Sequence, residues 1–139
     1  MRTVGYIHNR IKEIGIKDSA FRRTLFGTKR EIDELSKLLK EDESLDFILS
    51  GFEDGSSWLI ALTDRRLMLL NKGFVSLKKK ELMLDKISAV NIHKGLIQGK
   101  VFIEDAGAKT MTISQIYLDD IDGFVEAVND NVRAYKDSL

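Results

Sequence analysis

The sequence predicts an α+β protein, mainly β: a seven-stranded antiparallel barrel or sandwich with a C-terminal capping helix and an N-terminal helical extension. Near both ends of the chain, apolar residues recur every three or four positions, as on one face of a helix. Between residues 45 and 114 they alternate with polar residues or form short runs, as in strands. Turn-forming residues separate seven such runs, which is typical of small β-barrels and sandwiches.

The N-terminal extension, residues 1–27, is expected to hold two short helices. The first has an apolar stripe and stops at Gly15, because glycine readily takes the left-handed conformation that ends a helix. The second is expected from Ser19 to Phe26, closed by Gly27. The stripe of the first helix consists of Val4, Ile7, Ile11 and Ile14.

The main domain is expected to span residues 28–139. It begins with a lead-in helix at 28–41, since Thr28 and Glu31 have the spacing of a capping box. Strands are expected between residues 45 and 114, in seven segments: 45–50, 58–62, 67–70, 82–84, 87–92, 100–104 and 109–113.

The second strand is apolar on both of its faces. Trp58, Ile60 and Leu62 point to one side, and Leu59 and Ala61 point to the other. A sheet with one face in water would alternate apolar and polar residues. Both faces are therefore expected to be covered, one by the C-terminal helix and the other by the N-terminal helices or by another subunit.

The last element is expected to be an amphipathic helix at 117–136. Aspartates at its start and basic residues near its end oppose the helix dipole favourably. Its apolar stripe follows helical spacing and consists of Ile121, Phe124, Val125, Val128, Val132 and Tyr135.

Several segments resemble bacterial pleckstrin-homology-like (PH-like) domains, over about residues 28–130. They are Leu59–Leu70, Leu84–Val90, Lys94–Leu96, Gly99–Lys100 and the helical lead-in Gly27–Leu35, which is similar to the YokE-like group of bacteria and phages. The resemblance implies a PH-like fold and an interaction module, some of whose relatives assemble into rings or other oligomers. Eukaryotic relatives hold inositol phosphates with a basic first hairpin, whereas the corresponding turn here, Gly51–Gly55, is acidic.

The sequence contains no recognisable catalytic motif. His8 and His93 are its only histidines, and neither belongs to a triad or metal-ligand spacing. A P-loop, a nucleophile elbow and a zinc-protease motif are absent, as is cysteine. We therefore expect no enzyme activity, no small-molecule substrate, no metal and no other cofactor.

Charge and hydropathy narrow the class of partner. The zero net charge argues against a nucleic-acid partner, and no apolar run approaches the length that spans a bilayer. Without a signal peptide or cysteine, a cytoplasmic protein is expected. Charge nevertheless alternates in blocks, which neutralise each other within the fold or attract another copy or a charged partner: +6 over 1–30, −7 over 31–57, +6 over 58–100 and −5 over 101–139.

The first functional hypothesis is a protein–protein contact, with self-association favoured. Residues 1–27 carry a net charge of +4 and an apolar stripe that needs a docking surface, because an isolated helix of this length is marginal in water. Docking within the chain would make the segment a lid, and docking between chains, which we favour, would make an oligomer. The residues expected at this interface are Ile7, Ile11, Ile14, Phe21, Leu59 and Ala61.

The alternative hypothesis is peripheral binding to an anionic membrane surface through the hairpin 72–80. Apolar residues at its tip would enter the interface while lysines meet lipid phosphates. The competing interpretation is an ordinary strand with apolar residues inside and lysines in solvent. The residues expected to contact the membrane are Phe74, Val75, Leu77, Lys78, Lys79 and Lys80.

Overall fold

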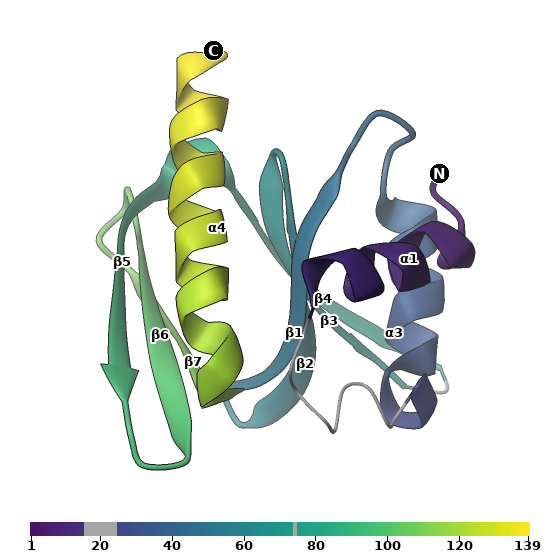
Figure 1. Cartoon of the computed structure of the whole chain (residues 1–139), viewed down its shortest axis with the longest axis horizontal. Helices are drawn as coiled ribbons and strands as arrows, with labels where there is room; N and C mark the ends of the chain where they lie inside the picture. Colours follow the sequence, from purple (N-terminus) through teal and green to yellow (C-terminus); the bar gives the residue numbers. More distant parts are fainter. Residues whose placement is uncertain (16–24, 74) are drawn as a thin grey trace.

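The computed structural model describes residues 1–15, 25–73 and 75–139. Phe21, Phe74 and most of the expected second helix lie outside these residues. Figure 1 shows the elements in chain order: α1 (Val4–Ile14), α3 (Leu25–Leu38), β1 (Leu45–Glu53), β2 (Ser56–Thr63), β3 (Arg66–Lys72), β4 (Leu77–Met83), η1 (Leu84–Lys86), β5 (Ile87–Lys94), β6 (Gln98–Asp105), β7 (Thr110–Tyr117) and α4 (Leu118–Asp137).

The seven strands form one antiparallel sheet in the order β4-β3-β2-β1-β7-β6-β5. The expected fold class is therefore confirmed, in the form of a strongly curved sheet whose two ends, β4 and β5, do not pair. Strand β1 joins the two halves, because it pairs along its length with β2 and, at Phe52 opposite Ser114, with β7. The Ser114 hydroxyl also donates a 3.2 Å hydrogen bond to the Phe52 carbonyl.

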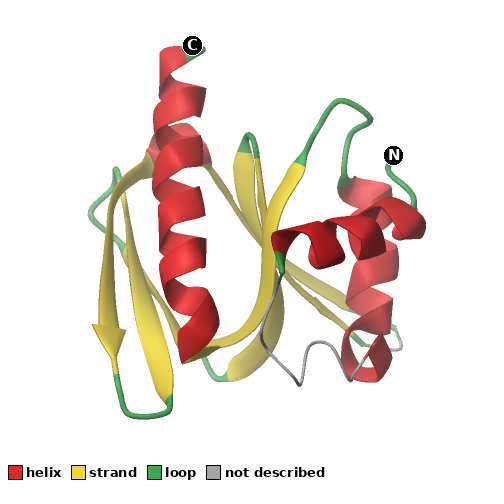
Figure 2. Cartoon of the chain, in the orientation of Figure 1, coloured by secondary structure: helices red, strands yellow, loops and turns green. Residues whose placement is uncertain are grey.

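Helix α4 covers the inner face of the sheet, where it stands over β1 and the β5–β7 half (Figure 2). Its predicted stripe is confirmed, since Ile121, Phe124 and Val128 are fully buried. The Phe124 ring lies 5.7 Å from the Phe47 ring of β1, at an interplanar angle of 57°. Close packing also explains a glycine in β6, because a side chain at Gly99 would come within 2.5 Å of Ile121.

Helices α1 and α3 cover the outer face of the β1–β4 half (Figures 1 and 2). Side chains on this face alternate with those that meet α4, so β2 contributes Leu59 and Ala61, and β3 contributes Met68 and Leu70. All four are at most 2% exposed. The expectation that both faces of these strands are covered is confirmed. Helix residues buried with them are Ile7, Ile32, Leu35 and Leu39.

Helix α1 has the ends that its sequence predicts. The Thr3 hydroxyl accepts a 3.0 Å hydrogen bond from the Tyr6 backbone N–H at the start of the helix. Gly15 ends it with a φ of 76°, and its N–H donates to the Ile11 carbonyl. Because that conformation costs other residues free energy, glycine is favoured at the stop.

Several predicted boundaries differ from the structure, and Gly27, which was expected to close a helix, lies inside α3. Helix α3 begins at Leu25, so Thr28 lies inside it instead of capping it. Glu31 contacts the end of β3, where its carboxylate accepts a 3.3 Å hydrogen bond from the Lys72 backbone N–H. Strand β4 begins at Leu77, five positions before the predicted start, since the lysines of this segment pair with β3 as an edge strand.

Candidate interaction surfaces

The N-terminal helix docks on its own chain through polar as well as apolar contacts. The Tyr6 hydroxyl accepts a 3.0 Å hydrogen bond from the Leu45 N–H, and Arg10 Nε donates one of 2.7 Å to the Leu45 carbonyl. Arg2 Nε donates to the Glu43 carbonyl at 3.1 Å. Helix α1 is thus fixed to the first residue of β1 and to the loop before it.

The residues expected at an interface between chains already have partners within one chain. Ile7 is fully buried, and Ile11 and Ile14 are half-buried against the core. Leu59 and Ala61 lie beneath α1 and α3, so neither is exposed to another molecule. An exchange of α1 between two chains would preserve the same contacts, and self-association by such an exchange stays a prediction.

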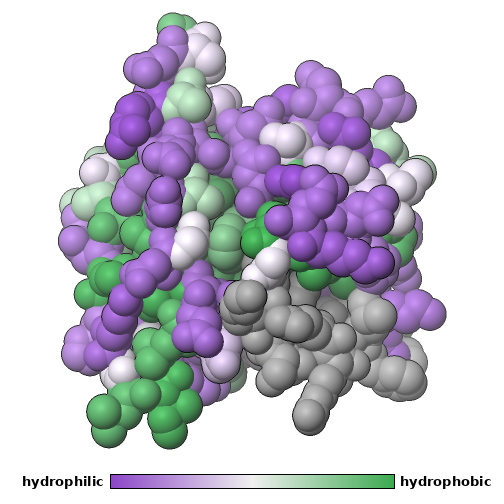
Figure 3. Space-filling view, in the orientation of Figure 1, coloured by the Kyte–Doolittle hydropathy of each residue, from purple (hydrophilic) through white to green (hydrophobic). Residues whose placement is uncertain are grey.

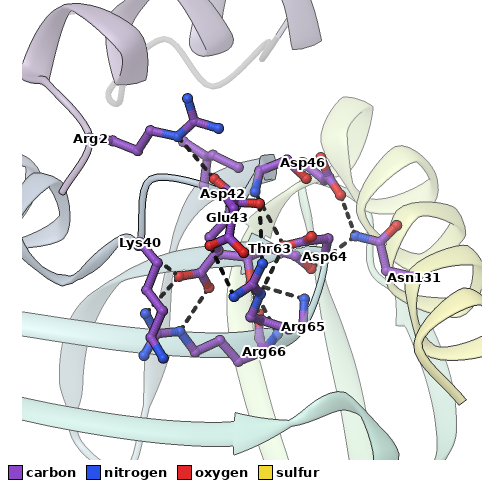
Figure 4. Close-up of polar contacts among 12 residues, drawn as sticks. Arg2, Lys40, Asp42, Glu43, Asp46, Thr63, Asp64, Arg65, Arg66 and Asn131 are labelled. Atoms are coloured by element: carbon purple, nitrogen blue, oxygen red, sulfur yellow. Dashed lines mark hydrogen bonds and ion pairs between the residues drawn. The ribbon is translucent and has the colours of Figure 1, made fainter. Parts of the chain in front are cut away.

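A buried ion pair ties the start of the sheet to the β2–β3 turn (Figure 4). Arg66 donates two hydrogen bonds of 2.8 Å to the Glu43 carboxylate, from Nε to Oε2 and from Nη2 to Oε1. Arg66 Nη2 also donates to the Leu38 carbonyl at 2.7 Å, which satisfies the end of α3. Glu81 of β4 receives a further bond of 3.1 Å from Nη1. One guanidinium therefore links α3, the following loop, β3 and β4.

The charge on Glu43 is stabilised by its partners. Burial raises the pKa of the Glu43 carboxyl, but the hydrogen bonds from Arg66 and from the Lys40 backbone outweigh it and hold this pKa below its ordinary value. The bond to Glu43 in turn raises the pKa of Arg66. The Glu43 side chain is fully buried and that of Arg66 is 12% exposed, so water screens the pair little.

The rest of this turn extends the same network. Thr63 Oγ1 accepts hydrogen bonds from the backbone N–H groups of Arg65 and Arg66. Asn131 of α4 donates to the Thr63 carbonyl at 2.9 Å and to Asp46 at 2.7 Å. The segment Thr63–Arg66 was predicted only to be a tight turn. In the structure it bonds to α3 through Arg66 and to α4 through Thr63, so it helps to position the helices on both faces of the sheet.

The β3–β4 hairpin exposes some of the predicted membrane-contacting residues. Val75 is 97% exposed and Leu77 is 38% exposed. Lys78 and Lys79 are exposed, and Lys79 lies 3.5 Å from Glu81 of its own strand. An apolar tip and lysines do occur side by side here.

Lys80 differs from its two neighbours because it already has partners. Its ammonium bonds to the Glu53 carboxylate and lies 5.4 Å from the centre of the Trp58 ring. The bond to Glu53 raises the pKa of Lys80. Glu53 and Trp58 therefore already bind Lys80, and the exposed lysines that remain are Lys78 and Lys79, which lie on opposite faces of β4.

A second exposed apolar patch was not predicted. The β5–β6 tip, residues 92–98, carries Leu96 with 100%, Ile97 with 78% and Ile92 with 40% exposure. Figure 3 shows this hydrophobic surface at the lower left, at the position of the β5–β6 hairpin in Figure 1. Lys94 beside it is neutralised by Asp122 of α4, at 2.7 Å. Hydropathy alone could not predict that these side chains are exposed, because the same apolar residues would also suit a buried strand.

The described parts of the chain show no arrangement that suggests bound metal. No three His, Asp or Glu side chains in those parts converge as metal ligands. None of the described helices is both long and apolar enough to cross a bilayer. His93, the one histidine of the sheet, is exposed on β5.

Sequence comparison now identifies the family. The family model described as "Bacterial PH domain" matches residues 39–130. The chain belongs to this family. The predicted resemblance to bacterial PH-like domains is therefore confirmed. No curated protein sequence matches the chain.

Solved structures support the same fold. A DUF1696 family protein with a pleckstrin-homology domain from Shewanella loihica PV-4 is similar with a TM-score of 0.54 and 14% identity, over 75% of this chain and 95% of that one. The linker-DH/PH domains of p115-RhoGEF give a TM-score of 0.52 and 11% identity, over 78% of this chain and 34% of that one. At such identities the likeness concerns the fold alone. PH domains are commonly modules that bind proteins or lipids.

Proposed function

We propose that this bacterial PH domain is a non-catalytic binding module that associates with a second copy of itself through the β5–β6 tip. The observation that carries the proposal is the full exposure of Leu96 beside the largely exposed Ile97. Neighbouring exposed apolar side chains at a hairpin tip are typical of a contact surface. Burying them removes apolar area from water, which favours association.

Charge supports a second copy as the partner. A two-fold symmetric contact places the same patch of each subunit against itself, so the patch must be self-complementary. The β5–β6 tip meets this condition, because its centre is apolar and Lys94 is already paired with Asp122. The β3–β4 hairpin does not, since Lys78 and Lys79 would face their own copies. The zero net charge of the chain also removes long-range repulsion between copies.

Sedimentation velocity over a range of protein concentrations tests this function. We expect the wild type to form a dimer or larger oligomer at high concentration, and Leu96→Asp/Ile97→Asp to stay monomeric. Val75→Asp is the control, because it places an aspartate at the exposed apolar residue of the other hairpin and should leave assembly unchanged. A wild type that is monomeric throughout contradicts the proposal. An oligomer that survives the double substitution but is lost on removal of residues 1–15 indicates exchange of α1 instead.

The alternative function is peripheral binding to an anionic bilayer, which the 97% exposure of Val75 beside Lys78 and Lys79 favours. Each lysine near such a surface contributes about 1 kcal/mol. If this function holds, the wild type sediments with phosphatidylserine vesicles, and Lys78→Glu/Lys79→Glu abolishes the binding. Leu96→Asp is the control and should leave it unchanged. A wild type that never sediments with these vesicles rules the alternative out.

A further inference from the structure

A polar pocket lies beside the turn of the β5–β6 hairpin, and Gly95 and Gln98 of the β5–β6 tip form part of its lining. Its volume is about 400 Å³, and it spans the last three strands of the sheet. The side chains that give it polar character are His93 of β5, Gln98 and Lys100 of β6, and Ser114 and Gln115 of β7.

The pocket is basic and has no acidic residue in its lining. His93 and Lys100 are directly opposite each other in the β5–β6 register, so their side chains share one face. This face points away from α4, because the neighbouring position Gly99 faces Ile121. Among the described residues, Lys100 makes no ion pair, whereas Lys94 on the α4 side is bound to Asp122. The pocket therefore presents a cation without a counter-charge.

The backbone at the rim of the pocket is strained. Gln115 has a φ of 57°, in the left-handed region that residues other than glycine and asparagine rarely adopt. It lies where the β6–β7 register shifts, between the pairs Gly99–Ile116 and Val101–Ile113. Such strain persists only where the surrounding structure maintains it, and it is concentrated at functional sites. A glycine would remove the strain but would also remove an amide from the pocket.

The chemistry of the lining selects among anions. Gln98 and Gln115 each offer both a donor and an acceptor, which matches a peptide group, whereas phosphate oxygens can only accept. The pocket contains one ammonium and no arginine, and it is not at a helix N-terminus, so it lacks the features that bind a dianion strongly. A single carboxylate attached to a peptide fits these groups better.

We propose that this pocket binds an extended acidic segment of a partner protein, with a carboxylate at Lys100 and neighbouring peptide groups at Gln98 and Gln115. Access is open, because β5 is the last strand of the sheet and residues 91–98 are all exposed. The site adjoins the apolar tip but does not depend on self-association, since Leu96 and Ile97, the side chains proposed to contact a second copy, are not part of its lining.

Titration of the ¹⁵N-labelled full chain with acetylated hexaglutamate, followed by amide NMR shifts, tests the proposal. We expect saturable shifts that are largest at Lys100, Ser114 and Gln115, and none with hexaglutamine. Lys100→Glu and the milder Lys100→Gln should each weaken binding at least tenfold. Lys78→Glu is the matched control, because it alters another exposed lysine that makes no ion pair with the residues the structure describes, and it should leave binding unchanged. Gln115→Gly should weaken binding severalfold while raising the melting temperature.

Three results would overturn the proposal. The first is the absence of saturable shifts at the pocket with hexaglutamate. The second is equal binding by Lys100→Glu and the wild type, which would indicate diffuse attraction to surface lysines. The third is a response at the same residues to inorganic phosphate or to phosphatidylserine vesicles but not to the peptide, which would assign the pocket to phosphate groups free in solution or on a bilayer. Repeating the titration with Leu96→Ser/Ile97→Ser, which removes the apolar side chains without adding negative charge beside Gln98, separates this site from self-association.

Discussion

At the scale of single residues, one arginine holds together segments that are far apart in the chain. Arg66 bonds to Glu43, to the Leu38 carbonyl and to Glu81, so it joins residues before the sheet to two of its strands. Loss of one partner of such a buried ion pair strongly destabilises the fold, because the remaining charge is left buried without compensation. Glu43 lies 23 positions from Arg66, and no local pattern in the sequence links them.

Glu43→Gln should lower the free energy of unfolding by about 3 kcal/mol at neutral pH, since it leaves Arg66 without its main charge partner. Urea denaturation measures this. Glu81→Gln is the matched control: its side chain is 29% exposed, and we expect a loss of about 0.5 kcal/mol. Equal losses in the two variants would show that burial does not set the strength of this network.

The Glu43 pair also predicts how stability depends on pH. Because the pKa of Glu43 is lower in the folded chain than its ordinary value of 4.5, the unfolded chain takes up the proton first as the pH falls. The contribution of Glu43 is therefore complete above pH 4.5 and is lost as the pH falls below this value toward the folded pKa. The difference in unfolding free energy between wild type and Glu43→Gln should shrink in that range. A difference that is the same at pH 7 and at pH 3 would contradict this assignment.

At the scale of elements, the sequence predicted those parts whose pattern is local. Three features were predicted correctly because each depends on residue spacing within one segment. They are the C-terminal end of α1 at Gly15, the apolar stripe of α4 and the two apolar faces of β2. Strand β4 was predicted too short, since its three lysines belong to an edge strand and do not alternate with apolar residues. The predicted start of α3 was wrong because it treated Thr28 and Glu31 as a capping box, whereas Glu31 bonds across to Lys72, a contact that only the tertiary fold creates.

Helix α4 depends on Phe124, which is fully buried against Phe47. Phe124→Ala should lower the free energy of unfolding by about 3–5 kcal/mol, through lost burial and the cavity left behind. Thermal and urea denaturation measure the effect. Val125→Ala, at the adjacent half-buried position, is the control, with an expected loss of about 1 kcal/mol. Similar losses in both variants would mean that α4 does not pack through the face described.

At the scale of the whole molecule, exposure separates the candidate binding surfaces from the surfaces that pack within the fold. The sequence predicted an interface at Leu59 and Ala61 because apolar side chains on this face have to be buried. In the structure α1 and α3 of the same chain bury them. The candidate contact surfaces are instead Val75, which the sequence had offered as a membrane contact, and Leu96 and Ile97, which hydropathy did not distinguish from core residues. Which apolar side chains remain outside depends on how the two halves of the sheet curve, and this is a property of the complete fold.

Removal of residues 1–15 should expose the outer face of the sheet. Ile7 alone buries a side chain worth about 1.5–3 kcal/mol, so we expect a comparable or larger loss in the free energy of unfolding. The truncated chain should also bind the hydrophobic dye ANS, which the intact chain should not. Asn9→Ala, at an exposed position of α1, is the control and should change neither measurement. A truncated chain with unchanged stability would show that α1 is dispensable for the fold.

The pairing of β1 with β7 has a consequence for how the chain reaches its fold. Each half of the sheet is built from neighbouring hairpins, whereas the junction of the halves joins Phe52 to Ser114, 62 positions apart. Closing a loop of that length costs chain entropy before the contacts at the junction can contribute favourable free energy. Contacts of this kind therefore slow folding. We expect the two groups of hairpins to form early and the junction to close late, together with the docking of α4 across it. The rate of folding should therefore respond more to substitutions in the β2–β3 hairpin, and the rate of unfolding more to substitutions at Ser114.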